Sequence, residues 1–84
     1  MQVILSNRAK KQLGRLNEPY KSQIRDSINN LEKEPPEGNI KKLQGRVGYR
    51  VTIGNYRVLF EIDKKNNLVK VFKIASRGDV YKEQ

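Results

Sequence analysis

The chain has 84 residues, with 18 lysines and arginines against 9 aspartates and glutamates, and it contains neither cysteine nor histidine. Without thiols and imidazoles there is no disulfide framework and no thiolate metal site, and a zinc enzyme is disfavoured, so we expect no metal and no cofactor. A net charge of +9 favours a polyanionic partner, namely nucleic acid, an anionic membrane surface or an acidic protein. The alternative is a basic surface that is merely solvated.

The length predicts one domain spanning residues 1–84 with a single small core. No apolar run approaches the roughly 18–20 residues that a membrane span requires. At the N-terminus the apolar residues precede the basic ones, which is the reverse of a secretory signal. We therefore expect a cytoplasmic protein that does not enter a membrane.

Two helices are predicted after a short strand at residues 3–5. Ser6 can cap the first helix through its hydroxyl. Apolar residues then recur on one helical face at Ala9, Leu13 and Leu16. A second helix is predicted from about 18 to 33, with Asn17 as its cap and residues 35–38 (PPEG) as its end. Its apolar residues are Tyr20, Ile24, Ile28 and Leu31. The short connection between the helices predicts a helical hairpin.

The segment from residue 38 to residue 60 contains no acidic residue. Its basic residues are Lys41, Lys42, Arg46, Arg50 and Arg57. Because the rest of the chain mixes both signs, this is a local excess of positive charge. Residues 41–47 are predicted to form a loop that leads into a strand.

A β-hairpin is predicted over residues 48–62, with apolar and polar residues alternating on both sides of Gly54-Asn55. A two-residue turn with glycine first favours a type II′ hairpin and fixes the register. The predicted pairs are Ile53 with Tyr56, Thr52 with Arg57, Val51 with Val58, and Arg50 with Leu59. Since cross-strand partners share a face, one face is predicted to be core: Tyr49, Val51, Ile53, Tyr56, Val58 and Phe60. The other face is predicted to be open and carries Arg50, Thr52, Arg57 and Leu59.

Residues 68–75 (LVKVFKIA) predict a last strand that is central or well covered, because it is apolar on both faces apart from Lys70 and Lys73. Lys73 marks either a pocket or an edge, and Phe72 is predicted to belong to the core. Residues 76–81 are predicted as a loop and a short helical turn. The fold class that follows is α+β: an N-terminal strand, a helical hairpin and a three-stranded meander. These form a mostly antiparallel four-stranded sheet with the helices on one face.

Three stretches of the sequence resemble a known family. GYRVTIGNYRVLFEID (residues 48–63), IASRGDVY (74–81) and KLQG (42–45) are similar to segments of RelE/ParE-superfamily toxins of type II toxin–antitoxin systems. The helical hairpin and the chain length agree, so the resemblance covers nearly the whole chain. The motif G-x-Y-R-V-L-x-E-I-D over residues 54–63 is quite specific, and R-x-D-V-Y over residues 77–81 is specific though short.

The resemblance implies one of two activities. RelE-like toxins enter the ribosomal A site and cut mRNA, whereas ParE-like toxins act on DNA gyrase and are not nucleases. RelE-like members carry an arginine in Y-R-V, an arginine after the last strand and a tyrosine in the tail, which are Arg57, Arg77 and Tyr81 here. Arg50 also matches a basic position of that branch. The resemblance therefore favours the RelE branch. Its implied partners are the ribosome, mRNA and an acidic RelB-like antitoxin that forms a hetero-oligomer with the toxin.

Two positions depart from the nuclease pattern. Thr52 occupies a site that is lysine in some nuclease members, and Ser76 precedes Arg77 where many relatives carry histidine or lysine. Both changes remove a candidate proton-transfer group. The remaining candidates for a base are Tyr81, Lys73, Lys70 or an arginine.

The chemistry predicted for such a site needs no metal, because RNA supplies its own nucleophile, the 2′-hydroxyl. The protein has to align it and stabilise the charge that develops on the phosphate. Arg57 is the candidate that grips the scissile phosphate. Arg77 is predicted to be a second clamp that assists the leaving 5′-oxygen. Tyr81 is predicted to stack on a base or to share a proton. Six residues are predicted to contact RNA without being catalytic: Arg50, Lys41, Lys42, Arg46, Thr52 and Lys73.

Each assignment has a structural alternative. In the structural alternative, Arg50 and Arg57 are ordinary solvated side chains. Arg77 would then pair with Asp79, and Tyr81 would pack at the edge of the core. Three functions follow for the whole chain: a ribosome-dependent mRNA endonuclease, a ParE-like gyrase inhibitor, or a non-catalytic RNA-binding module.

Overall fold

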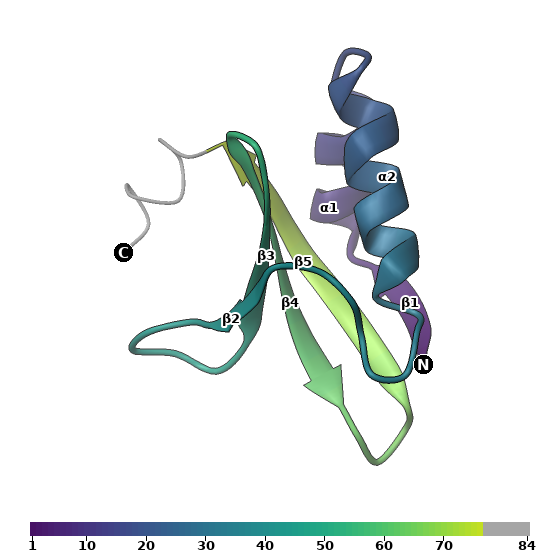
Figure 1. Ribbon diagram of the computed structural model, residues 1–84, viewed down its shortest axis with the longest axis vertical. Coiled ribbons are helices and arrows are strands. Elements are labelled where there is room, and N and C mark those ends of the chain that lie inside the picture. The colour runs from purple at the N-terminus through teal and green to yellow at the C-terminus, as the bar shows by residue number, and fades with distance from the viewer. Residues whose placement is uncertain (77–84) are drawn as a thin grey trace.

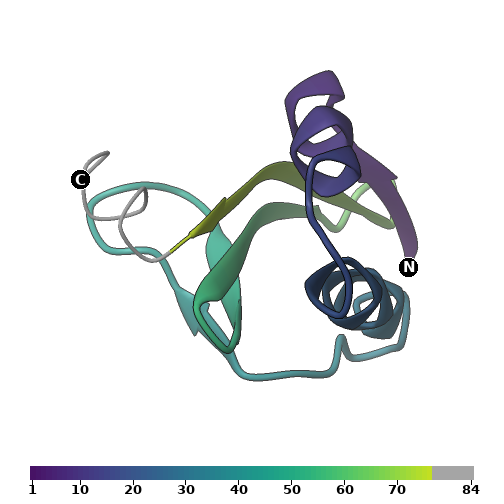
Figure 2. The same ribbon diagram turned by 90° about the horizontal axis from the view of Figure 1, so that it is seen from above.

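The computed structural model, which describes residues 1–76, has two layers: a twisted sheet and two helices packed on one of its faces (Figures 1 and 2). The α+β class and the placement of the helices are as predicted. The elements are β1 (Gln2–Leu5), α1 (Asn7–Gly14), α2 (Tyr20–Asn30), β2 (Ile40–Lys42), β3 (Tyr49–Ile53), β4 (Tyr56–Asp63) and β5 (Leu68–Ser76). No helix within residues 1–76 is long and apolar enough to cross a membrane.

The sheet has five strands in the order β1-β5-β4-β3-β2, where four were predicted. The additional strand is β2, which pairs antiparallel with β3 in a stretch predicted as a loop. Three residues are too few for an alternation to be recognised, and β2 forms only because β3 offers it a free edge. β1 pairs parallel with β5 and all other pairs are antiparallel.

The hairpin of β3 and β4 has the predicted register in all four pairs. Gly54 has φ 58°, the left-handed value that the first turn residue of a type II′ hairpin requires. A β-bulge interrupts the pairing of β4 with β5 between Leu59 and Phe60. There, Leu59 pairs with Lys73 and Phe60 with Val71, so Phe72 is the extra residue of the bulge.

The core lies between the helices and the sheet. Its largest fully buried side chains are Phe60, Ile24, Leu31, Val51, Val58, Val69 and Val71. Burying an apolar side chain of this size contributes about 1.5–3 kcal/mol. The predicted core face of the hairpin is confirmed, since Val51, Val58 and Phe60 are fully buried and the others pack against them. Phe72 was wrongly predicted as core: it is half-buried and lies outside this cluster.

The first helix begins as predicted and the second does not. The Ser6 hydroxyl accepts a hydrogen bond from the Ala9 N–H at 3.1 Å. α2 begins at Tyr20 without Asn17 as its cap, because the Glu18 carboxylate accepts hydrogen bonds from the Ser22 N–H at 2.8 Å and from the Ser22 hydroxyl. These bonds lower the pKa of Glu18, the hydroxyl bond most. The helix also ends at Asn30 and not at 33, because the next turn tightens into i to i−3 hydrogen bonds.

Helix α1 also covers the part of β5 that β1 leaves unpaired. β1 ends at Leu5, opposite Val71, so the outer edge of β5 is free from Phe72 onward. The Ser6 hydroxyl donates to the Phe72 carbonyl at 3.2 Å, and the Gln12 side-chain oxygen accepts from the Ile74 N–H at 2.7 Å. The side chains of Ser6, which caps α1, and of Gln12 within α1 thus take the place of a neighbouring strand.

Candidate nucleic-acid interface

The side of the sheet opposite the helices carries two rows of register partners, which we call the arginine face. The first row crosses four strands and consists of Lys41, Arg50, Leu59 and Lys73. The second row consists of Thr52, Arg57 and Ala75. Backbone pairing alone therefore brings together five of the predicted RNA-contacting and catalytic residues, drawn from four segments of the chain.

The arginine face is not open, contrary to the prediction. Leu59 is 5% exposed, Lys73 3% and Ala75 3%, while Arg50 and Arg57 are half-buried. Leu59 lies in β4, and the aliphatic stems of its register partners Arg50 and Lys73 flank it on both sides. Long basic side chains are largely covered here although they alternate with core residues, and an alternating pattern does not reveal this.

Burial strengthens the electrostatics of these cations. The Nε atoms of Arg50 and Arg57 and the Nζ atom of Lys73 are shielded from solvent. A cation in such an environment attracts an anion more strongly than it does in bulk water, because the effective dielectric constant is lower. The planar forks of the arginines also match phosphate oxygens bidentately. The face is therefore suited to binding a phosphate group.

The lysines of the edge strand are separated by the sheet. Lys41 pairs with Arg50 and lies on the arginine face, whereas Lys42 pairs with Tyr49 on the face toward the helices. The Tyr49 ring stacks on Phe60 with centroids 5.7 Å apart, at the margin of the core. Both lysines are exposed, but only Lys41 can act together with the arginines.

Arg46 lies on the exposed loop between β2 and β3, and its guanidinium carbon is 4.9 Å from the centroid of the Phe72 ring. The loop approaches β4 very closely at Gly48, which has φ 129°. A Cβ placed there would lie 3.0 Å from the Phe60 carbonyl oxygen. This loop therefore extends past β4 to β5, and its tip ends beside the bulge.

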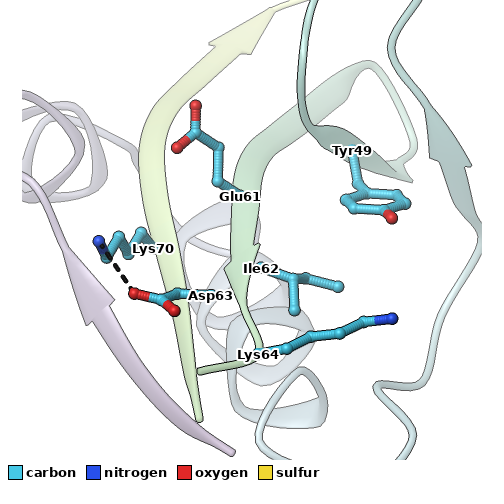
Figure 3. A pocket seen from close by; sticks show the side chains of 6 residues that line it. All are labelled: Tyr49, Glu61, Ile62, Asp63, Lys64 and Lys70. Atoms are coloured by element: carbon cyan, nitrogen blue, oxygen red, sulfur yellow. Dashed lines mark ion pairs between the residues drawn. The ribbon is translucent and has the colours of Figure 1, made fainter. Parts of the chain in front are cut away.

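The acidic residues of β4, Glu61 and Asp63, lie near the end of the strand, whereas Arg57 lies near its start. Asp63 accepts hydrogen bonds from the Asn66 side chain at 2.9 Å and the Asn66 N–H at 3.1 Å, which lower its pKa most, and the Lys70 ammonium lies 3.5 Å away. Asp63 and Lys70 border a pocket of about 460 Å³, and Lys64 extends away from their ion pair (Figure 3). The other residues that line the pocket are Tyr49, Glu61 and Ile62. With two carboxylates, this pocket is a poor phosphate site compared with the arginine face.

Arg77 and Tyr81, two of the three residues predicted to be catalytic, lie outside the described residues, as does Asp79. Arg57, Arg50, Thr52 and Lys73 are brought together, with Lys41 beside them and Arg46 on the adjoining loop. Sequence reasoning missed the contribution of Phe72 to this region, because it assigned Phe72 to the core together with the other aromatic residues, in a strand that is apolar on both faces.

Comparisons with known proteins place the chain in a family. Residues 3–81 match the family model described as the ParE toxin of the type II toxin–antitoxin system parDE. No curated protein matches the sequence. Among solved structures, the fold is similar to an archaeal RelE–RelB complex from Pyrococcus horikoshii OT3, with 28% identity, a TM-score of 0.77, and 92% of this chain and 94% of that chain covered.

Two further structures have the same fold at lower identity. The toxin–antitoxin complex RelBE2 from Mycobacterium tuberculosis matches with a TM-score of 0.78 and 19% identity, covering 90% of this chain and 96% of that one. The isolated E. coli RelE toxin matches with a TM-score of 0.76 and 21% identity, covering 98% and 92%. From the family match over residues 3–81, together with this fold, the chain belongs to the ParE toxin family within the RelE/ParE superfamily of type II toxin–antitoxin toxins.

Proposed function

We propose that this toxin is a ribosome-dependent mRNA endonuclease that inhibits translation in the cytoplasm. The observation that carries the proposal is the arginine face itself, where Arg50, Arg57 and Lys73 present shielded cationic atoms on paired strands. Strand pairing holds their backbones in fixed positions, so only side chains have to move when a phosphate binds. Arg57 grips the scissile phosphate, and Arg50, Thr52 and Lys73 hold the flanking backbone.

The proposed reaction is attack of an RNA 2′-oxygen on the adjacent phosphorus as its proton passes to Tyr81 or solvent. The bond from phosphorus to the 5′-oxygen of the next nucleotide breaks, that oxygen takes up a proton, and a 2′,3′-cyclic phosphate remains. Charge accumulates on the phosphate oxygens, where arginine donors stabilise it. Arg77 and Tyr81 complete the proposed site, as the clamp on the leaving oxygen and the group that stacks on a base or shares a proton. Positioning by the ribosome compensates for the absence of histidine as a general base.

The proposed partner in the resting state is an acidic, RelB-like antitoxin in a hetero-oligomer. The fold is similar to toxins solved in complexes with RelB antitoxins, from Pyrococcus horikoshii and from E. coli. With a net charge of +9, the toxin attracts a peptide rich in carboxylates. The antitoxin neutralises the toxin by covering the arginine face, with carboxylates near Arg50, Arg57 or Arg77.

The test is 5′-end mapping of mRNA from cells that briefly express the toxin. Wild type is expected to generate new 5′ ends within translated regions and to arrest growth, while purified toxin cuts free RNA poorly. The Arg57→Ala variant is expected to fold, but it should neither generate new 5′ ends nor arrest growth. Arg25→Ala is the matched control, because Arg25 is an exposed arginine on α2 in the layer opposite the arginine face. Growth arrest by wild type without new 5′ ends refutes the nuclease.

A second candidate, inhibition of DNA gyrase without nuclease activity, is favoured by the family match, which names ParE toxins. The same cells distinguish the two candidates. Double-strand DNA breaks and an SOS response with intact mRNA identify a gyrase inhibitor. Salt-sensitive RNA binding with neither toxicity nor cleavage identifies a plain RNA-binding module.

A further inference from the structure

We propose that Phe72, Arg46 and Glu61 form a nucleobase subsite beside the arginine face, and that it prefers guanine. This inference rests on the proposed action on RNA and adds to it a residue-level account of base preference. The three side chains border a pocket of about 410 Å³, together with Ile4 and Lys70. It therefore combines an aromatic ring, an apolar wall, a cation and a carboxylate, the components with which proteins bind bases.

The Phe72 ring stands on a backbone that is held in place. The Ser6 N–H donates to the Val71 carbonyl at 2.9 Å, and the Ser6 hydroxyl donates to the Phe72 carbonyl at 3.2 Å. Ser6 is also the residue that caps α1. Phe72 has no partner in β4, and it alternates with the buried Val71, so its side chain borders the same pocket as Lys70. The ring is thus a rigid platform on which a base can stack.

Arg46, in contrast, is held loosely. It lies on an exposed loop, and its guanidinium carbon is 4.9 Å from the centroid of the Phe72 ring. A solvent-exposed cation–π contact is generally weaker than the stacking of a base on an aromatic ring. A base can therefore displace the guanidinium from the ring. Arg46 then stays close enough to pair with the phosphate of the bound nucleotide.

Glu61 supplies the selectivity. It is exposed, and within residues 1–76 its carboxylate makes no hydrogen bond or ion pair, although its register partner is Lys70. The Lys70 ammonium is directed to Asp63, at 3.5 Å. A carboxylate only accepts hydrogen bonds, and guanine offers it two adjacent donors, N1–H and the N2 amino group. Uracil presents two carbonyl oxygens and one donor, so its edge is repelled.

The position of the subsite fits a nucleotide close to the one gripped by Arg57. Glu61 follows Arg57 by four residues in β4 and lies on the same face, since Arg57, Leu59 and Glu61 alternate with the core residues. At about 3.4 Å per residue the two positions are about 14 Å apart along the strand. Strand β4 thus carries the phosphate-binding Arg57 near its start and Glu61 of the base-selective pocket toward its end.

Nuclear magnetic resonance titration of the purified toxin with guanosine and uridine monophosphates tests the subsite without requiring cleavage. Guanosine monophosphate is expected to shift the Phe72 ring signals and to bind at least about tenfold more tightly than uridine monophosphate. Glu61→Gln is expected to remove most of that preference. Phe72→Leu is expected to weaken the binding of both nucleotides. Glu32→Gln, at an exposed glutamate beyond α2, is the matched control and is expected to bind like wild type.

Equal affinity for the two nucleotides, or Phe72 signals that do not move, overturns the subsite. So does an unchanged preference in Glu61→Gln. Failure of the proposed function would be seen in a different experiment. If the toxin is not a nuclease, 5′-end mapping finds intact mRNA in cells, whatever the titration shows. Guanine-selective binding by a toxin that leaves mRNA intact would keep the subsite and refute the nuclease.

Discussion

Lys41 and Lys42 are consecutive in the chain but lie on opposite faces of the sheet, because Lys41 pairs with Arg50 and Lys42 with Tyr49. Both residues are positively charged, both are exposed, and both belong to the short strand β2. They differ only in whether they accompany the arginines. The chain thus provides an internal comparison for deciding which face binds a polyanion.

We predict that Lys41→Ala weakens binding to single-stranded RNA and Lys42→Ala much less. A lysine that contacts a phosphate releases a counterion, so the slope of log K against log salt should decrease by about 0.7 for Lys41→Ala. Fluorescence anisotropy at several salt concentrations measures both slopes. Because each variant loses one positive charge, equal losses would mean that net charge governs binding and that the arginine face is not the interface.

We predict that Arg57→Ala lowers the rate of mRNA cleavage on ribosomes by about 10²–10³-fold, the usual effect of removing one donor from a developing oxyanion. Arg57→Lys should recover only part of the rate, because lysine restores the charge without the bidentate fork. Single-turnover cleavage on programmed ribosomes measures both, with circular dichroism to verify folding. Full activity in Arg57→Lys would reduce the role of Arg57 to that of a point charge.

The hairpin and the helical hairpin could be predicted because local rules determine them. Gly54-Asn55 fixes the turn, the turn fixes the register, and the register places Arg50 and Arg57 on one face. The burial of Lys73 and Leu59 could not be predicted, since it depends on which strands lie next to β4. The edge strand β2 and the bulge at Phe72 also arise from pairing between distant segments, which leaves no periodic signal in the sequence.

Gly48 is predicted to be the glycine whose replacement destabilises the β2–β3 loop most. With φ 129°, alanine there is strained, and its Cβ would also lie 3.0 Å from the Phe60 carbonyl oxygen and 3.1 Å from Leu43. We expect Gly48→Ala to cost about 3 kcal/mol of unfolding free energy. Gly45→Ala, with φ 74° and open space around the new Cβ, should cost about 1 kcal/mol. Urea denaturation measures both, and similar losses would contradict the close approach.

Gln12 is predicted to stabilise the fold from outside the core. Its side-chain oxygen accepts from the Ile74 N–H at 2.7 Å, where β5 has no neighbouring strand on that side. Gln12→Ala leaves this partly buried donor without its acceptor and should cost about 1–3 kcal/mol. Gln23→Ala, at an exposed position of α2, changes the same residue type in a helix and should have little effect. Thermal unfolding compares them, and equal midpoints would show that water replaces Gln12.

Asp63 is predicted to stabilise the folded protein, and this contribution is lost at acid pH. Its pKa lies below the ordinary 3.8, chiefly because the Asn66 side chain donates to the carboxylate. The folded protein therefore keeps Asp63 ionised to a lower pH than the unfolded chain does. Its contribution is complete above about pH 4 and disappears as the pH falls through the folded pKa.

Both Asp63→Ala and Asn66→Ala should therefore flatten the loss of stability below about pH 4, the first by removing the carboxylate and the second by removing its main donor. Unfolding midpoints in urea across this pH range measure the slopes. Asn66→Ala keeps the carboxylate and the Lys70 ion pair at 3.5 Å, so it separates the hydrogen bond from the charge pair. If Asn66→Ala retained the wild-type slope while Asp63→Ala lost it, the Asn66 side chain would not be the group that lowers the pKa, which would leave the N–H of residue 66 and Lys70. Raising the salt concentration would then distinguish these two, because an exposed ion pair is screened.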